Sequence, residues 1–188
     1  MNVSSQKAST FPVAIVLIAF MFILLPLNQA EARSGTEKLG DHLQYALPLY
    51  ALGRSSLGND HAGTRQLFYS FSSAALTTQG LKELTQQKRP DWEPGDRKRS
   101  FPSGHATHAF SSAMFIHQRY GLHEAVVPYF LAAVVAYSRV DAKKHYVHDV
   151  LGSMAVSAIY TQLLVSKKVG DKHNVVIGKN RVYYVRKF

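Results

Sequence analysis

The sequence predicts an all-α protein, a helical bundle of about five to six helices with a short C-terminal β-hairpin. Along most of the 188-residue chain, apolar residues recur at helical intervals, and glycine-containing segments separate these stretches. Near the C-terminus the pattern changes to the alternation that is typical of strands. The chain is 46% hydrophobic and 18% charged, a composition that suits one globular domain with its own core.

Residues 1–32 differ from the rest and are predicted to form a secretory signal peptide. One lysine precedes an apolar stretch at 11–27, and Ala30 and Ala32 have the spacing of a signal-peptidase site. The alternative is an uncleaved membrane anchor, because the apolar stretch approaches the length that spans a bilayer. Under both interpretations the domain at 33–188 is exported, to the periplasm or to the outer face of the cytoplasmic membrane.

Five stretches of the exported part have helical periodicity. They cover residues 37–52, 63–87, 104–120, 123–138 and 146–166. The last stretch is either a buried core helix or a short membrane segment, because residues 150–166 carry no charge. The same question applies to residues 124–137, where Pro128 and the short length favour a buried helix. At 174–188, β-branched and aromatic residues alternate around a Gly-Lys-Asn turn, which predicts the hairpin.

The net charge of +10 favours an anionic partner. Nucleic acid, an anionic membrane surface and a phosphorylated substrate all fit this charge. Export argues against nucleic acid, and the aromatic residues fall mainly inside the apolar helices and not among the basic runs. The absence of cysteine excludes disulfides, thiolate metal sites and cysteine nucleophiles.

A stretch at residues 102–105 predicts an anion site at the beginning of a helix. Ser103 precedes the helical run in a position typical of an N-cap, and His105 falls in the first turn. The free N–H groups of a helix N-terminus bind phosphate and other oxyanions, and Gly104 permits a close approach to the backbone. The alternative is that Ser103 only caps the helix and His105 is an ordinary surface residue.

Two further clusters carry candidate functional residues. His145 and Asp149 are four apart, a spacing that puts an imidazole and a carboxylate on one helical face. Such a carboxylate accepts the ring N–H and leaves the other nitrogen free to attack. Lys82 and Arg89 are seven apart, so both cations are expected to point the same way from two turns of one helix. The alternatives are a solvated polar pair and a solvated basic face.

Together the three clusters resemble the signature of the type 2 phosphatidic acid phosphatase superfamily, which includes class A acid phosphatases and vanadium haloperoxidases. The family pattern is K-x6-R-P, then P-S-G-H, then S-R-x5-H-x3-D, and every defining position matches in the same order. The matching residues are Lys82, Arg89 and Pro90; Pro102, Ser103, Gly104 and His105; and Ser138, Arg139, His145 and Asp149.

The resemblance implies how a phosphate group is held. Lys82, Arg89 and Arg139 are expected to bind its non-bridging oxygens. The Ser103 hydroxyl and the Gly104 N–H are expected to add two hydrogen bonds. Three cations and two donors supply the charge stabilisation that phosphoryl transfer needs, so no metal and no cofactor is expected.

The resemblance also implies the chemical roles. His145 is expected to be the nucleophile that forms a phosphohistidine, with Asp149 orienting it. His105 is expected to protonate the leaving alkoxide and then to activate water. Because one imidazole works protonated and the other neutral, we expect a bell-shaped pH dependence with a mildly acidic to neutral optimum. His108 is interpreted as a packing or rim residue.

The substrate class and the setting stay open at this level. Family members act on lipid phosphates, polyprenyl diphosphates or small soluble esters, so the expected partner is a phosphorylated lipid or a small phosphate ester. A soluble or peripheral periplasmic protein is favoured, with docking on an anionic membrane surface through basic residues that include 97–99 and 186–188. The alternatives are a vanadate-dependent haloperoxidase and a non-catalytic phosphate- or lipid-binding module. The pattern does not predict the oligomeric state.

Overall fold

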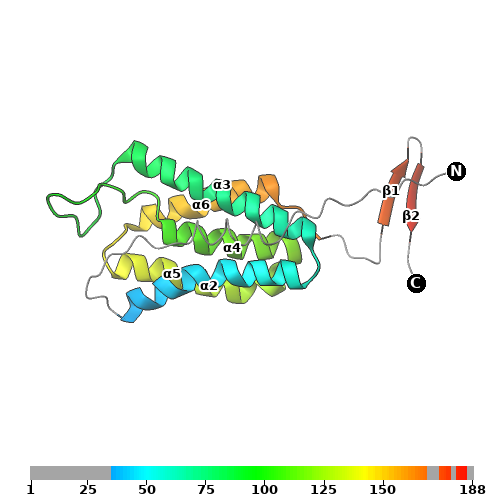
Figure 1. The fold of residues 1–188 in the computed structure, drawn as a ribbon, viewed down its shortest axis with the longest axis horizontal. Coiled ribbons are helices and arrows are strands. Elements are labelled where there is room, and N and C mark those ends of the chain that lie inside the picture. The colour runs from blue at the N-terminus through cyan, green and yellow to red at the C-terminus, as the bar shows by residue number, and fades with distance from the viewer. Residues whose placement is uncertain (1–34, 169–173, 179–180, 186–188) are drawn as a thin grey trace.

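The computed structural model describes residues 35–168, 174–178 and 181–185. Its helices are α2 (Gly35–Leu57), α3 (His61–Thr85), α4 (Gly104–Tyr120), α5 (Leu122–Asp141) and α6 (Val147–Leu164). They lie side by side along the long axis of the molecule (Figure 1). The predicted all-α bundle is confirmed, with five helices in the described part of the chain. The predicted leader at 1–32 lies outside it.

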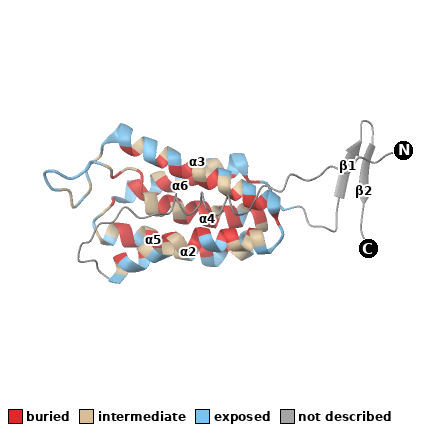
Figure 2. Ribbon diagram, viewed as in Figure 1, coloured by how far each residue is buried: buried red, intermediate tan, exposed pale blue. Residues whose placement is uncertain are grey.

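Helix α4 forms the centre of the bundle and packs against each of the other four helices (Figure 1). Ala106, Ala109 and Ala113 lie on its buried face, and each is 0% exposed. Small side chains at such contacts let helix axes approach closely. Figure 2 shows the buried residues along the inward faces of the helices.

Helix α4 has the predicted bounds, and the ends of the other four helices differ from the predicted ranges by one to five residues. Helix α2 does not stop near Gly53 but continues to Leu57, because a single glycine inside a helix costs only about 1 kcal/mol. Helix α3 ends at Thr85, where Gln86 takes a left-handed C-cap conformation with φ of 44°. Helix α5 extends to Asp141 and includes Arg139 in its last turn.

A buried ion pair closes the end of the bundle where α3 begins. Both carboxylate oxygens of Asp60 accept hydrogen bonds from Arg119, at 2.7 and 2.8 Å, and one also accepts from Tyr120. Asp60 additionally caps α3 through the N–H of Gly63. Burial opposes ionisation of Asp60, but these hydrogen bonds prevail and lower its pKa to about 2. This network joins α3 to α4 at the end of the bundle opposite His105 and His145.

The outer faces of the bundle carry many apolar side chains. On α6 the buried side holds Val150, Ser153 and Val156, whereas Leu151 and Leu163 are exposed. Of the helices at 35–168, none combines the length and the apolar character that crossing a bilayer requires.

The two described strands follow the bundle in the sequence. Strand β1 (Asn174–Gly178) pairs antiparallel with strand β2 (Arg181–Val185), in a register that places Asn174 opposite Val185 and Gly178 opposite Arg181.

Candidate active site

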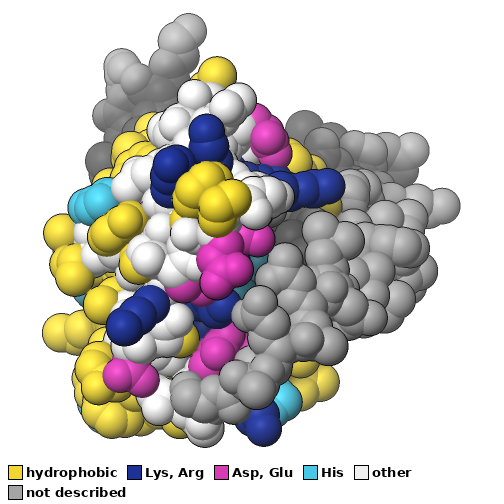
Figure 3. Space-filling view, turned by 90° about the vertical axis from the view of Figure 1, so that its left-hand side faces the viewer, with side chains coloured by type: hydrophobic (Ala, Val, Ile, Leu, Met, Phe, Trp, Pro, Cys, Tyr) yellow, Lys and Arg dark blue, Asp and Glu magenta, His cyan; other side chains and the backbone are white. Residues whose placement is uncertain are grey.

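The candidate residues gather at one end of the bundle. The C-terminal ends of α3 and α5 and the N-terminal ends of α2, α4 and α6 all lie at the left-hand end of the view in Figure 1. Figure 3 looks onto this end, where basic and acidic side chains lie side by side. Segments from residue 37 to residue 149 therefore contribute to one region.

The helix start predicted at Ser103 is confirmed. Ser103 is the N-cap of α4, and its Oγ accepts the N–H of Ala106 at 3.5 Å. The side chain of Ser103 is fully buried. At Gly104 an added Cβ meets no atom within 4 Å, so open space borders the first backbone turn of α4. This turn offers N–H groups and the positive end of a helix dipole to an anion.

His145 and Asp149 contact each other, but not from one helical face as predicted. Helix α6 begins at Val147, so His145 lies in the turn before it, with its N–H bonded to the carbonyl of Arg139 at 3.1 Å. His145 Nδ1 donates to Asp149 Oδ2 at 3.3 Å. The same carboxylate oxygen accepts the N–H of Tyr146, which is the N-cap of α6. Asp149 thus caps a helix and orients the histidine.

The protonation states of this pair follow from its burial. Burial lowers the pKa of His145 to about 4, and the nearby charges of Lys82 and Arg89 act in the same direction. Burial opposes ionisation of Asp149, but hydrogen bonds from His145 and Ser100 hold its pKa below the usual value. At neutral pH the pair is therefore a neutral imidazole and a carboxylate. Because Nδ1 carries the proton, Nε2 keeps a free lone pair for attack.

Lys82 and Arg89 are not two turns apart on one helix, because α3 ends between them. Lys82 lies in the last turn, where its buried Nζ donates to the carbonyls of Arg99 and Ser100 at 2.8 and 3.3 Å. Burial lowers the pKa of Lys82 to about 7, and the charges of Arg89 and Arg99 add to the effect. Arg89 lies in the following loop, and its buried Nε has no hydrogen-bond partner in the described chain. An anion would satisfy both cations.

Arg139 and His105 meet at a carboxylate that the sequence did not suggest. Arg139 Nη1 donates to Asp41 Oδ1 at 2.8 Å, and His105 Nε2 lies 2.9 Å from the same oxygen. Burial lowers the pKa of His105, the hydrogen bond to Asp41 opposes this, and the charges of Arg139 and Lys82 reinforce it. The charges of Lys82 and Arg139 thus act on His105. The charges of Lys82 and Arg89 act on His145.

Two residues of the site, Asp41 and Ser100, were not predicted from the sequence. Asp41 lies on α2, far from every motif, and no local pattern marks it. Ser100, three residues before the N-cap, donates its hydroxyl to Asp149 Oδ2. Its only signal is its position beside the motif at 102–105, and a serine there has no distinctive spacing.

His108 packs as expected. Its ring lies 5.1 Å from that of Phe71, and its Nδ1 is buried without a hydrogen-bond partner in the described residues. Burial lowers its pKa to about 3, so His108 stays neutral. Within residues 35–168 and the two strands, no three His, Asp or Glu side chains are grouped as a metal site would need.

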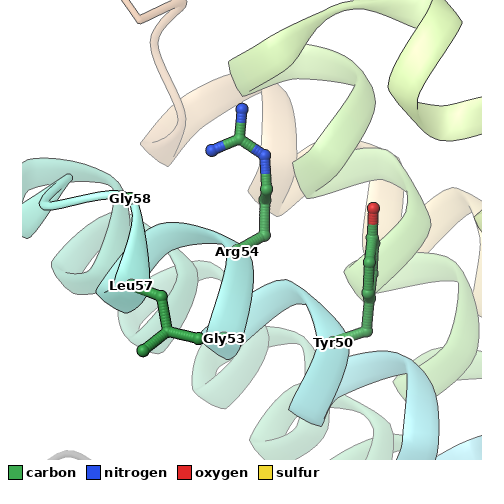
Figure 4. Close-up of a pocket in the computed structure, with 5 residues that line it drawn as sticks. All are labelled: Tyr50, Gly53, Arg54, Leu57 and Gly58. Carbon is green, nitrogen blue, oxygen red and sulfur yellow. The ribbon is translucent and has the colours of Figure 1, made fainter.

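An open pocket lies elsewhere, along the second half of α2. Tyr50, Gly53, Arg54, Leu57 and Gly58 line it (Figure 4). Arg54 forms an ion pair with Glu124 of α5 at 2.7 Å, so its charge is already engaged. None of the candidate residues at the other end of the bundle lines this pocket.

Several known proteins are similar to the chain. A family model described as the PAP2 superfamily matches residues 63–170. The lipid A 4'-phosphatase of Helicobacter pylori strain J99 is 29% identical over 151 residues, covering 74% of this chain and 76% of that protein.

Two solved structures are similar to the chain. LpxE of Aquifex aeolicus has a TM-score of 0.57 and 22% identity, over 78% of this chain and 92% of that one, which shows a shared fold. A transmembrane PAP2-type phosphatidylglycerolphosphate phosphatase of Bacillus subtilis has a TM-score of 0.42 and 21% identity, over 81% of this chain and 93% of that one.

Proposed function

The chain belongs to the PAP2 superfamily and is a phosphatase, and from this premise we propose that it cleaves the phosphate ester of a lipid through a phosphohistidine at His145. The observation that carries the proposal is the His145–Asp149 pair. A buried neutral imidazole donates from Nδ1 to a carboxylate and keeps Nε2 free, next to two cations.

The phosphate is bound before it reacts. Lys82, Arg89 and Arg139 neutralise its non-bridging oxygens, and the Ser103 hydroxyl and Gly104 N–H add hydrogen bonds. The open space at Gly104 and the unpartnered Nε of Arg89 support this arrangement. Cations and backbone dipoles that are already in place stabilise the charge that develops in phosphoryl transfer.

The first step transfers the phosphoryl group to the enzyme. His145 Nε2 attacks phosphorus, the bond to the leaving oxygen breaks, and His105 gives that oxygen a proton. Asp149 stabilises the positive charge that forms on the His145 ring. The products of this step are an alcohol and a phosphohistidine.

The second step uses the same groups in reverse. His105, now neutral, takes a proton from water as the water oxygen attacks phosphorus. The bond between phosphorus and His145 Nε2 breaks, inorganic phosphate leaves, and both histidines return to their starting protonation states.

A lipid phosphate at a membrane surface is the favoured substrate. The similar protein of H. pylori is named for a lipid, and the net charge of +10 suits anionic headgroups. Leu84 and Val147, each two residues along the chain from a site residue, are 80% and 60% exposed, and Arg97 and Lys98 in the loop before α4 are exposed too. We place the enzyme at the outer face of the cytoplasmic membrane or in the periplasm, after export directed by residues 1–32.

Phosphate release by the purified full chain tests the proposal. We would compare lipid A, phosphatidic acid and a polyprenyl diphosphate in detergent with p-nitrophenyl phosphate. The variants are His145→Ala and, as a matched control, His123→Ala, an exposed histidine at the other end of the bundle. Lipid turnover that is lost only in His145→Ala supports the proposal. Turnover of p-nitrophenyl phosphate at the same rate as the lipids would mean that the pocket does not select lipid substrates. No turnover of any ester by the parent would favour a non-catalytic binding module.

A further inference from the structure

A single carboxylate oxygen joins two of the proposed catalytic groups. Asp41 Oδ1 lies 2.9 Å from His105 Nε2 and 2.8 Å from Arg139 Nη1. These three residues come from α2, α4 and α5. Helix α2 lies outside residues 63–170, which the family model matches, so no motif of the family includes Asp41.

Other residues in the first turns of α2 also contact Arg139 or make room for it. Arg139 Nη2 donates to the carbonyl of Glu37 at 2.7 Å, and its Nε donates to Ser138 Oγ at 3.0 Å. Gly40 allows this approach, because an added Cβ would lie 1.9 Å from Ser138 Oγ and 2.7 Å from Arg139 Nη2. The guanidinium is therefore held in one orientation by contacts from the first turns of α2.

We propose that Asp41 is a positioning residue of the phosphatase reaction, which orients the imidazole of His105 and the guanidinium of Arg139 and helps His105 to hold its proton. This inference rests on the proposed function, since it gives both partners of Asp41 the roles stated there. Because the carboxylate only accepts, Nε2 of His105 carries the proton in this contact, and in the charged ring Nδ1 carries the second proton.

Burial and two nearby cations oppose the protonation of His105, and Asp41 favours it. Burial lowers the pKa of His105, and Lys82 from α3 and Arg139 from α5 lower it further. His108, one turn along α4, is neutral and brings no negative charge. Asp41 thus opposes these influences and favours the protonated form of His105 that acts as the acid.

The test compares Asp41→Asn and Asp41→Glu with Glu124→Gln. Glu124 pairs with Arg54, so this control also removes a carboxylate from an α5–α2 ion pair, but away from the site. We expect Asp41→Asn to lower kcat by about tenfold or more with a smaller change in KM, since general acid catalysis contributes roughly 10²–10⁴. We also expect the alkaline limb of its pH profile to move down by about one unit.

Asp41→Glu keeps the charge but displaces it by one methylene. We expect it to restore the alkaline limb and part of kcat. If circular dichroism shows that Asp41→Asn does not fold, the test rests on Asp41→Glu. A kcat of Asp41→Glu equal to that of the parent would then overturn the positioning role. If kcat fell as far in Glu124→Gln as in Asp41→Asn, the positioning role would also be overturned, because the loss of any ion pair between α2 and α5 would then explain the effect.

A second readout does not depend on turnover. The imidazole of His105 is titrated by NMR, with its resonance assigned through His105→Gln. A lower His105 pKa in Asp41→Asn supports the inference, and an unchanged one overturns it. A parent that fails to release phosphate from every ester overturns the proposed function, whereas normal parent activity with an unaltered Asp41→Asn profile overturns this inference alone.

Discussion

Ser100 donates its hydroxyl to Asp149 Oδ2 at 2.5 Å, and both side chains are 0% exposed. Ser100 lies in the loop before α4, and Asp149 lies in the first turn of α6. Ser100 belongs to no motif, but its contact ties the segment before the motif at 102–105 to the motif that contains His145 and Asp149. Asp149 can orient His145 only while its own carboxylate is held, and Ser100 holds the oxygen that contacts His145.

Ser100→Ala is therefore expected to lower kcat by about tenfold and to reduce the free energy of unfolding by about 1–3 kcal/mol, because a buried charged acceptor loses a donor. Steady-state kinetics and urea unfolding measure the two effects. Ser72→Ala is the control, since Ser72 Oγ is buried without a partner in the described chain. Equal kcat values for Ser100→Ala and the parent would contradict the orienting role of Ser100.

Gly104→Ala is expected to weaken phosphate binding by about tenfold or more while leaving the melting temperature unchanged. The Cβ meets no protein atom within 4 Å, so it fits the free enzyme, but it occupies the space that an oxyanion needs near the first turn of α4. Inhibition by inorganic phosphate gives the affinity. Gly80→Ala on α3, which also meets no neighbour, should stabilise the fold and leave the affinity as it was. If Gly104→Ala bound inorganic phosphate as tightly as the parent, the phosphate would not lie against the first turn of α4.

Phosphate binding is expected to take up a proton above pH 7. Burial lowers the pKa of Lys82 to about 7, so the amine is largely neutral in the free enzyme at pH 8, and a bound anion favours the charged form. Calorimetry at pH 8 in buffers with different ionisation enthalpies measures the uptake. Lys82→Arg, which stays charged, is expected to bind without it. An equal uptake in both proteins would assign the proton to another group.

The parts of the site that the sequence predicted are those carried by local signals. The N-cap at Ser103 could be read from neighbouring residues, and the contact between His145 and Asp149 from their spacing. The predicted end of the helix that carries Lys82 was two residues too late, because periodicity does not show where a left-handed residue such as Gln86 ends a helix. Asp41 could not be predicted, since its contacts with residues 64 and 98 positions away depend on how α2 packs.

The stability of the fold is expected to fall as the pH drops below about 6.5, and His108 is one cause. Burial lowers the pKa of His108 to about 3 and that of His145 to about 4, while both return to about 6.5 in the unfolded chain. Between these values the unfolded state binds more protons, so each pH unit costs about 1.4 kcal/mol per histidine, and above pH 6.5 the effect vanishes.

His108→Phe removes one of these protons while keeping a ring against Phe71, so its melting temperature is expected to decline less steeply from pH 6.5 to pH 4 than that of the parent. Scanning calorimetry across this range measures the slopes, and His123→Phe, at an exposed position, serves as the matched control. His108 takes no part in the proposed chemistry, so kcat should stay within about threefold of the parent, the change of a position that only packs. Parallel melting curves for parent and His108→Phe would show that His108 is not held neutral in the folded protein, and the acid sensitivity would then rest on His145.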